Sequence, residues 1–285
     1  MAYDIMQRIH SKMPSFSKGQ RRIATVILED YDKAAYMTAS KLGFLADVSE
    51  STVVRFASEL GYDGYPELQR AVQELVRTKL TPNQRIAVTN QRIGNGDVLE
   101  SVLQSDIEKI KYTLEHIDRN AFDAAVQCLL NAGTIYIMGV RSSGTLASFL
   151  AFNLQMIFDN VKFVNPSSAS EVFEQILPMG KGDVLFAMTF PRYSKKILKA
   201  VRYARDCGVT VIGLTDSTVS PLSEFADHLL TAQSDMASFV DSLVAPLSII
   251  NALVVAVTRC RKEEVTERFD KLERIWDEYD VYDKH

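Results

Sequence analysis

The spacing of apolar residues divides the chain into a helical N-terminal part and a later part of a different kind. Between Ser17 and Asp32, isoleucine, valine and tyrosine recur at intervals of three and four residues, the period of an amphipathic helix. Ser17 and Gln20 form a capping-box pattern at its start. Further helices are expected from about Thr38, from Ser49 and from about Pro66 to Leu80. The pattern therefore predicts an all-α N-terminal domain.

From about Val98 the pattern changes: two helices lead into "TIYIMG", after which short apolar runs alternate with helical stretches. Five strands are expected: Thr134–Gly139, Lys162–Asn165, Asp183–Thr189, Thr210–Thr215 and His228–Thr231. Apolar strands that alternate with helices indicate a parallel sheet covered on both faces. The later part is therefore predicted to be an α/β domain with a five-stranded parallel sheet flanked by helices. A long helix near Val240–Thr258 and an amphipathic one near Glu263–Tyr279 close the chain.

The segment Thr81–Asp97 lies between these two parts. It is polar, contains a proline and two glycines, and shows no clear period. Such a composition is typical of a connection, so we interpret the segment as an interdomain linker.

The stretch "LADVSESTVVRFASELGY", Leu45–Tyr62, has the pattern of a DNA-reading helix. Ser49 is a good N-cap, because its hydroxyl can accept a hydrogen bond from a free backbone N–H. The face opposite the apolar stripe carries small hydroxyl side chains, one acid and one cation: Ser51, Thr52, Ser58, Glu50 and Arg55. Hydroxyls and an arginine near the start of such a helix can reach phosphates and base edges in the major groove. A plain amphipathic helix of a bundle would show the same pattern, so both interpretations stay open here.

The preceding turn supports a helix-turn-helix. Gly43 lies inside the previous helix, where glycine costs about 1 kcal/mol, which indicates a close approach of two crossing helices. Asp47 lies in the turn, where a left-handed backbone is often needed and aspartate tolerates it.

Two strand-to-helix turns of the later part suit an anion. "TIYIMGVRSSGTLASFLAFNL" offers free N–H groups at a helix start together with the hydroxyls of Ser142 and Ser143. "FAMTFPRYSKKIL" repeats the design, with Thr189 at the strand end, Ser194 at the helix start and Arg192 nearby. Two such turns predict a phosphate site at the carboxyl edge of the sheet. The first turn lacks both GxGxxG and the Lys-Ser/Thr of a P-loop. Empty turns capped by serine are the alternative.

Composition and charge add modest limits. The 285 residues fit one large or two smaller domains, and the net charge of −4 argues against a generally basic nucleic-acid-binding coat. Residues 1–80 carry 11 Lys or Arg and 10 Asp or Glu, against 21 and 26 in the rest. The N-terminal part is therefore slightly basic by comparison, which weakly favours a polyanion partner.

The cysteines and apolar runs bear on location. Three widely spaced cysteines argue against a disulfide framework or a zinc site and predict free thiols in a reducing cytosol. The N-terminus lacks the apolar region of a secretory signal. The longest apolar run, Leu243–Val257, is short for a membrane span and reads as a buried helix. We therefore expect a cytoplasmic protein without membrane association.

Catalytic patterns are sparse. The four histidines lie in unrelated contexts, and neither a Ser-His-Asp order nor a metal-ligand spacing stands out. No metal site, no cofactor and no enzymatic activity are therefore predicted. Glu171 could point toward the phosphate site, although an acid at a helix start is more often a simple partner of the helix dipole.

Together the two motifs resemble the RpiR family of bacterial transcriptional regulators. The N-terminal resemblance covers about Met13–Leu80 and is carried by "FSKGQRRIATVILED" and "VSESTVVRFASELGYDGYPELQ". The C-terminal resemblance covers about Asp106–Cys260 and is carried by "IYIMGVRSSG", "GKGDVLFAMTFPRYS" and "GVTVIGLTDSTVSPLSEFADHLL". The resemblance implies a helix-turn-helix DNA-binding domain (1–80), a linker with the start of a connecting helix (81–105), a sugar isomerase (SIS) phosphosugar-binding domain (106–260) and a C-terminal helix (261–285).

The resemblance also implies roles for single residues. The residues expected to face DNA are Ser51, Thr52 and Arg55, with Ser49 at the helix start. Those expected to hold a phosphate are Ser143 first, then Thr189 and Ser194, with Ser142 beside them. This chain departs from the family where many SIS domains have a glycine before the first-loop serine, because it has Arg141 and Ser142 there. It also has Pro191, without an N–H, in the second loop. Arg192 or Arg141 would replace the missing donor by charge-assisted hydrogen bonds.

We therefore expect a sequence-specific DNA-binding transcriptional regulator, controlled by a small phosphorylated sugar or related acid. Its partners would be a double-stranded DNA operator, the effector and further copies of itself, as a homodimer or homotetramer. One alternative is a phosphosugar isomerase with a helical appendage, in which Glu171 or His228 would serve as the base. Another is a sugar-phosphate-sensing module that binds a protein partner.

Overall fold

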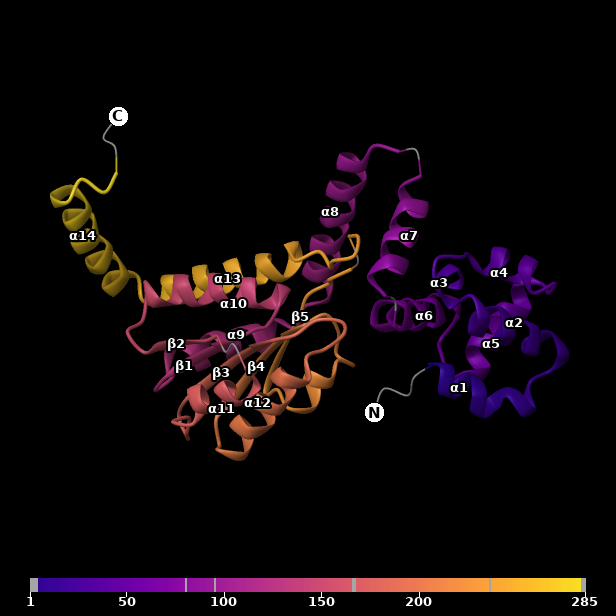
Figure 1. The fold of residues 1–285 in the computed structure, drawn as a ribbon, viewed down its shortest axis with the longest axis horizontal. Coiled ribbons are helices and arrows are strands. Elements are labelled where there is room, and N and C mark those ends of the chain that lie inside the picture. The colour runs from indigo at the N-terminus through magenta and orange to yellow at the C-terminus, as the bar shows by residue number, and fades with distance from the viewer. Residues whose placement is uncertain (1–4, 80, 95, 166–167, 236, 283–285) are drawn as a thin grey trace. The chain divides into compact units, whose positions relative to one another are not determined.

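The computed structural model describes residues 5–79, 81–94, 96–165, 168–235 and 237–282. The chain forms two compact units (Figure 1). The first comprises residues 1–101 together with 235–241, and the second comprises 102–234 and 242–285. Helix α8 (Val98–His116) begins in the first unit and continues into the second.

The first unit is helical, as predicted. Its elements are α1 (Ile5–Lys12), a short 3-10 turn (Met13–Ser15), α2 (Lys18–Glu29), α3 (Tyr31–Ala34), α4 (Ala39–Leu45), α5 (Glu50–Glu59), α6 (Tyr65–Lys79) and α7 (Pro82–Ile93). The apolar faces of α1–α6 enclose one core, in which the rings of Phe16 and Phe56 lie 5.1 Å apart. The capping box at the start of α2 is present, because Ser17 and Gln20 exchange hydrogen bonds. The predicted end of α6 at Leu80 lies outside the described residues.

Helix α7 occupies part of the segment Thr81–Asp97, in which the sequence showed no clear period. The interpretation of this segment as an interdomain linker did not include a helix. Thr81 and Gln84 form a capping box, and Pro82 takes the first helical position, where its missing N–H costs nothing. The buried residues of α7 are the polar Arg85 and Thr89. A pattern of apolar residues could not reveal a helix whose buried positions are polar.

Tyr65 on α6 is expected to make the folding stability of this unit decrease at alkaline pH. Its buried hydroxyl donates a hydrogen bond to the carbonyl of Met37 at 2.7 Å, and burial raises the pKa of Tyr65 from 10.0 to about 12. Between these values the unfolded chain ionises while the folded chain keeps its proton. Folding stability is therefore complete below pH 10 and falls by about 2–3 kcal/mol as the pH rises to 12.

The variant Tyr65→Phe isolates this effect. At pH 7 it should be less stable than the wild type by about 1 kcal/mol, because one hydrogen bond is lost. Gln69 still donates to the same Met37 carbonyl, so that acceptor stays satisfied. Between pH 10 and 12 the order should reverse, since phenylalanine does not titrate. Urea unfolding at both pH values measures the two differences, and a constant difference across this range would contradict the assignment.

The second unit contains a five-stranded sheet in the order β2-β1-β3-β4-β5, with every neighbouring pair parallel. Its strands are β1 (Ile135–Met138), β2 (Val161–Val164), β3 (Val184–Met188), β4 (Thr210–Thr215) and β5 (His228–Thr231). The predicted five-stranded parallel α/β sheet is confirmed, and each strand lies within about one residue of its expected bounds. The central strands β1 and β3 are buried throughout, which explains their continuous apolar sequence.

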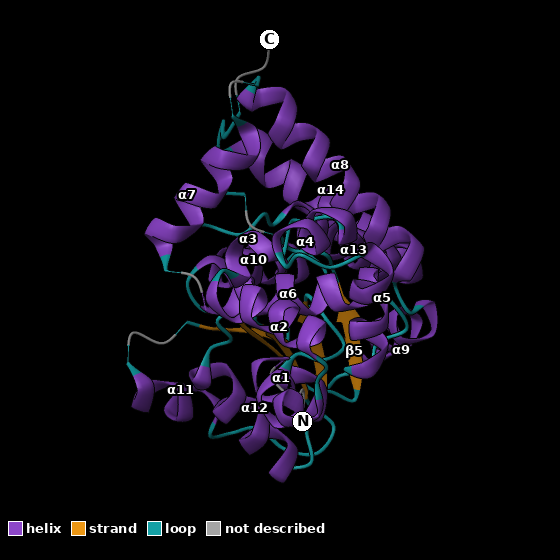
Figure 2. Cartoon of the chain, turned by 90° about the vertical axis from the view of Figure 1, so that its right-hand side faces the viewer, coloured by secondary structure: helices purple, strands orange, loops and turns teal. Residues whose placement is uncertain are grey.

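Helices cover both faces of the sheet (Figure 2). One face packs against α9 (Arg119–Leu130), α10 (Ser142–Gln155) and α13 (Val244–Cys260). The other packs against α11 (Ala169–Ile176), α12 (Lys195–Asp206) and a 3-10 turn (Pro221–Glu224). Since all strands run in one direction, the strand-to-helix loops β1–α10 and β3–α12 meet at one edge of the sheet.

The chain closes with α13 and α14 (Lys262–Glu278). Helix α13 starts at Val244 rather than near Val240, because Val240 belongs to a hydrogen-bonded turn with Ala237. Among the described residues, no single helix is long and apolar enough to cross a membrane. Helices α13 and α14 reach that length and composition only as a pair, and they meet at a bend of 98°.

Candidate nucleic-acid interface and anion-binding loops

Helices α4 and α5 cross through a tight turn that depends on two residues. A Cβ atom on Gly43 would lie 2.9 Å from the carbonyl oxygen of Val48, so only glycine lets the two backbones come this close. Asp47 has φ +51°, in the left-handed region. Both expectations from the sequence are confirmed, and the geometry is that of a helix-turn-helix.

Arg22 of α2 fixes this turn, which the sequence did not reveal. Its guanidinium donates to the Asp47 carboxylate at 2.5 Å and to the Asp47 carbonyl at 2.6 Å. The two groups lie 25 residues apart in the chain, so no local pattern could pair them. The contact links α2 to the left-handed residue of the turn that precedes α5.

The predicted DNA-facing residues gather at the start of α5. Ser49, Ser51 and Arg55 are exposed and Thr52 is half-buried. The backbone of Ser49 is that of an N-cap, but the expected hydrogen bond from its hydroxyl to a backbone N–H is absent. The Ser49 hydroxyl instead lies 2.9 Å from those of Ser51 and Thr52. The first backbone N–H groups of α5 therefore keep their capacity to bind a phosphate oxygen.

The residues around the start of α5 would also suit contact with the major groove of DNA. Arg55 forms no ion pair with any acidic residue that the structure describes, so its guanidinium is available. Phe44 is 84% exposed at the end of α4, and Val54 is 41% exposed beside Arg55. Apolar side chains at such positions can contact thymine methyl groups. The apolar period used to find the helices does not single out these outward-facing residues.

The β1–α10 loop is folded tightly around Gly139. A Cβ atom there would lie 2.2 Å from the carbonyl oxygen of Ser143, so no other residue fits without moving the helix start. The Ser143 hydroxyl is buried and lies inside the loop, donating to the Val140 carbonyl at 2.9 Å and accepting from the Val140 N–H at 3.1 Å. Ser142, by contrast, is exposed.

Arg141 occupies a backbone position that normally requires glycine. It is the N-cap of α10 with φ +58° and ψ −127°. A residue with a Cβ pays roughly 1–3 kcal/mol for such a conformation. The exposed guanidinium meets no acidic partner among the described residues. Strain of this kind is common where a side chain serves a ligand.

The β3–α12 loop resembles the first loop, because it also contains a buried hydroxyl that forms a hydrogen bond within the loop. The buried Thr189 hydroxyl accepts a hydrogen bond from the Ser194 N–H at 3.1 Å. Ser194 is the N-cap of α12, and its own hydroxyl makes no capping bond. Arg192 is exposed and has φ +64°. Each of these two loops thus presents an exposed arginine with a positive φ angle.

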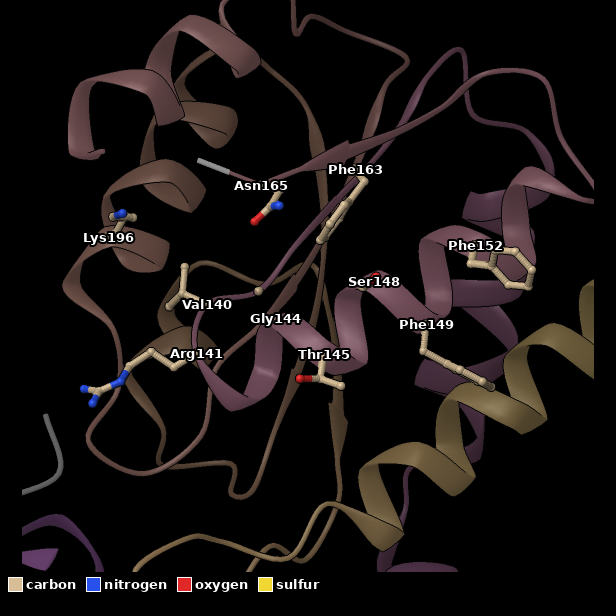
Figure 3. A pocket seen from close by; sticks show the side chains of 11 residues that line it. Val140, Arg141, Gly144, Thr145, Ser148, Phe149, Phe152, Phe163, Asn165 and Lys196 are labelled. Atoms are coloured by element: carbon tan, nitrogen blue, oxygen red, sulfur yellow. The ribbon is translucent and has the colours of Figure 1, made fainter. Parts of the chain in front are cut away.

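A cavity of about 860 Å³ opens beside the first loop (Figure 3). Arg141 and Lys196 lie toward one end of it, and Phe149 and Phe152 lie toward the other. Asn165, from the segment after β2, projects into the space near Phe163. Its lining contains two cations and no acidic side chain, in a protein whose net charge is −4. The cavity therefore favours an anionic ligand that also has an apolar or planar part.

Glu171 does not line this cavity. It forms a capping box with Ser168, whose N–H donates to the Glu171 carboxylate at 3.3 Å. This contact agrees with the simpler interpretation, a partner for the start of α11.

A buried acid follows β4 at the same sheet edge and was not singled out from the sequence. Asp216 is 6% exposed, accepts a hydrogen bond from the Tyr193 hydroxyl at 3.3 Å and lies 3.1 Å from the Thr215 hydroxyl. These contacts tie the β3–α12 loop to the end of β4. The signal in the sequence was the polar pair Thr215-Asp216 at the end of an apolar strand. Among the described residues, no cluster of His, Cys, Asp and Glu could hold a metal ion.

Comparison with known proteins identifies both domains. A sequence model described as "Helix-turn-helix domain, rpiR family" matches residues 3–79, and one described as "SIS domain" matches residues 128–256. The fold and the two matched models thus define a regulator with a helix-turn-helix domain and a sugar isomerase domain. The chain belongs to the RpiR family of transcriptional regulators.

Relatives align over nearly the whole chain. The HTH-type transcriptional regulator HexR of Escherichia coli is 26% identical, covering 94% of this chain and 96% of its own length. HexR of Pseudomonas aeruginosa is 25% identical, with coverage of 90% and 89%. Among solved structures, the Vibrio vulnificus NanR protein complexed with ManNAc-6P matches with a TM-score of 0.60, 24% identity and coverage of 96% and 98%. At that identity the likeness shows the fold alone.

Proposed function

We propose that this protein regulates transcription by binding a specific DNA operator with an affinity that a small phosphorylated sugar or related acid controls. The observation that carries the DNA half is the start of α5. There an exposed Arg55 and three clustered hydroxyls lie beside the N-terminus of the helix, next to a turn that the Arg22–Asp47 contact links to α2. Such a regulator acts on the chromosome, so we place it in the cytoplasm.

The effector half is supported by the two loops and the cavity. Arg141 and Lys196 give the cavity a cationic end, and the start of α10 adds backbone N–H groups that suit a phosphate. The NanR structure that shares this fold contains ManNAc-6P, which agrees in class with a sugar phosphate here. We propose Ser142, Arg141, Arg192 and Ser194 as direct ligands. Ser143 and Thr189 would act mainly by holding the loops, because their hydroxyls already bond within them.

An isomerase would need a base at the sugar. Glu171 is engaged in a helix cap, and His228 starts β5 at the opposite end of that strand from its carboxyl edge. The relatives reported above are named as transcriptional regulators. The proposal is therefore a regulator rather than an enzyme.

Arg55→Ala should weaken operator binding by about 10–100-fold, because one good arginine contact to a base is worth about 1–3 kcal/mol. Arg70→Ala is the matched control: it removes the same charge from an exposed position on α6 and should change binding far less. Fluorescence anisotropy at fixed salt measures both, with circular dichroism to verify folding. Equal effects of the two variants would remove Arg55 from the reading surface.

Arg141→Gly should change stability and effector binding in opposite directions. Glycine relieves the strained backbone, so the sugar isomerase domain should gain roughly 1 kcal/mol in unfolding free energy. Loss of the guanidinium should weaken sugar-phosphate binding by about 10-fold or more. Arg141→Ala is the control, since it removes the cation and keeps the strain. Calorimetric titration and thermal unfolding give the two readouts, and binding unchanged in both variants would exclude Arg141 as a ligand.

A further inference from the structure

Buried polar side chains are concentrated around the connection between β5 and α13, of which residues 232–235 and 237–243 are described. Most of the buried polar and charged residues that the structure describes belong to this connection or to the network that holds it: Arg85, Lys109, Thr113, Thr215, Asp216, Ser234 and Ser242. Burying a polar group costs free energy unless the group is paired, and apolar packing often stabilises a fold equally well. A polar network at this place therefore needs a reason other than stability.

The connection begins at the edge of the sheet that carries the two candidate ligand loops. The Ala232 N–H donates to the Thr215 carbonyl at 2.8 Å, directly after β5. The next residue, Asp216, accepts a hydrogen bond from the Tyr193 hydroxyl at 3.3 Å. Tyr193 belongs to the β3–α12 loop and lies between two of the proposed ligands in the sequence. A movement of this loop on ligand binding would therefore reach the connection through the end of β4.

The two ends of the connection are held together on α8. The Ser234 hydroxyl donates to the Ser242 carbonyl at 2.9 Å, which brings the two ends side by side. The Ser242 hydroxyl donates to the Asp106 carboxylate at 2.7 Å, and the Gln233 N–H donates to the Thr113 hydroxyl at 2.9 Å. These hydrogen bonds fix both ends on a helix that itself begins in the first unit.

Between these two ends the chain leaves the second unit. Residues 235–241 belong to the first unit, so two of the points at which the chain passes between the units are the ends of this short segment. Within the first unit, the Asp241 carboxylate lies 3.0 Å from the guanidinium of Arg85 on α7, which also donates to the Phe239 carbonyl at 3.3 Å. Asp241 directly precedes Ser242, so a displacement of the anchored end would also displace this carboxylate.

We propose that the β5–α13 connection transmits ligand binding at the sheet edge to the DNA-binding unit, and that the Arg85–Asp241 ion pair is made in one state of the regulator and broken in the other. This proposal rests on the proposed function, because it takes an anion at the β3–α12 loop as the signal. A buried ion pair suits such a switch, since separating its groups is strongly unfavourable and intermediate positions are poorly populated. Neither residue lines the cavity, so both act as positioning residues. A purely structural pair would behave alike whether or not the loop is occupied.

Hydrogen exchange of the full chain tests the transmission, with inorganic phosphate as the probe in place of chloride at constant ionic strength. In the wild type, phosphate should slow exchange at the β3–α12 loop and change exchange along α7 by at least about 5-fold, the lower end of ordinary coupling between sites. Arg192→Ala should abolish both changes, because it removes a proposed ligand from the loop. A loop that responds while α7 does not, or an α7 response that survives Arg192→Ala, would overturn the proposal. No response at the loop would contradict the anion site itself, and with it the signal to be transmitted.

The variant Asp241→Asn separates transmission from structure, because it removes the charge and keeps the shape of the side chain. The loop should respond to phosphate as in the wild type, whereas the response of α7 should be lost. Asp123→Asn, at an exposed position on α9, is the matched control and should keep both responses. A full α7 response in Asp241→Asn would contradict the proposed role of the ion pair. The wild type and Arg192→Ala leave α7 and the connection unaltered, so their comparison decides the proposal even where Asp241→Asn unfolds the helix.

Discussion

Gly139→Ala is expected to destabilise the sugar isomerase domain by about 3 kcal/mol or more, and to abolish effector binding with it. The new methyl group would lie 2.2 Å from the Ser143 carbonyl oxygen, 2.6 Å from the Ser143 carbonyl carbon and 3.0 Å from the Ala147 Cβ. Two of these atoms are backbone, so relief requires the start of α10 to move away from β1. That movement would separate the loop from the cations beside it.

Gly144→Ala is the matched control for this substitution. Its Cβ would meet the Gly139 carbonyl oxygen at 3.5 Å, an ordinary contact, and alanine favours the helix in which the residue lies. The variant should be as stable as the wild type or slightly more so. Thermal and urea unfolding of both variants measure the contrast. Similar stability of Gly139→Ala and Gly144→Ala would contradict the packing of α10 against the end of β1.

Arg85→Ala should destabilise the N-terminal unit by about 3–5 kcal/mol, the usual cost of removing one partner of a buried ion pair. The Arg85 side chain is fully buried, and its guanidinium lies 3.0 Å from the Asp241 carboxylate and donates to the Phe239 carbonyl at 3.3 Å. Both partners belong to the segment 235–241, which is part of this unit although it follows β5 in the chain. Alanine would leave the carboxylate, 11% exposed, without this cation.

Arg92→Ala provides the comparison within the same helix. Arg92 is exposed in the last turn of α7, and its replacement should change stability by less than about 0.5 kcal/mol. Arg85→Met serves as a second variant, since it keeps much of the buried volume while removing the charge, and should also destabilise. Denaturant unfolding of the three variants measures these differences in stability. A wild-type midpoint for Arg85→Ala would show that the pair contributes nothing to this unit.

The sheet was largely predictable because burial on both faces demands continuous apolar strands. The bounds of β4 and β5 agree with the prediction in full, and those of the others differ by about one residue. The order of strands was not predictable from these runs, since it depends on which way each crossover helix turns. Helix α7 was missed because its buried residues are polar: Arg85, which forms an ion pair with Asp241, and Thr89.

The types of the candidate site residues were predictable, but their hydrogen-bond partners were not. The sequence placed hydroxyls at the start of α5 and at two loops, and the structure has them there. The sequence could not show that the hydroxyls of Ser143 and Thr189 form hydrogen bonds within their own loops. The partners in these hydrogen bonds depend on how each loop is folded. The Arg22–Asp47 contact and the Tyr193–Asp216 contact join residues that are distant in sequence. Interactions of that kind become visible only when the chain is folded.

The proposed regulation can be described as thermodynamic linkage between effector binding in one domain and DNA binding by the other. Under the proposed function, an effector that binds one arrangement of two copies better than another would shift the spacing of their reading helices. DNA half-sites recur at about 34–36 Å or a multiple, so a small rotation changes the match to an operator. A coupling of about 1–3 kcal/mol is enough for a 5–150-fold change in DNA affinity.

The most direct test is the effect of sugar phosphates on operator affinity. Fragments of the protein's own genome would be selected for binding, and the retained fragment titrated by fluorescence anisotropy at fixed salt, because phosphate contacts make affinity salt-dependent. The titration would be repeated with each member of a panel of sugar phosphates and with the matching unphosphorylated sugars. We predict specific binding that one sugar phosphate changes at least about 5-fold and that its unphosphorylated form leaves unchanged. No selective retention of DNA, or an affinity that no sugar phosphate alters, would contradict the account.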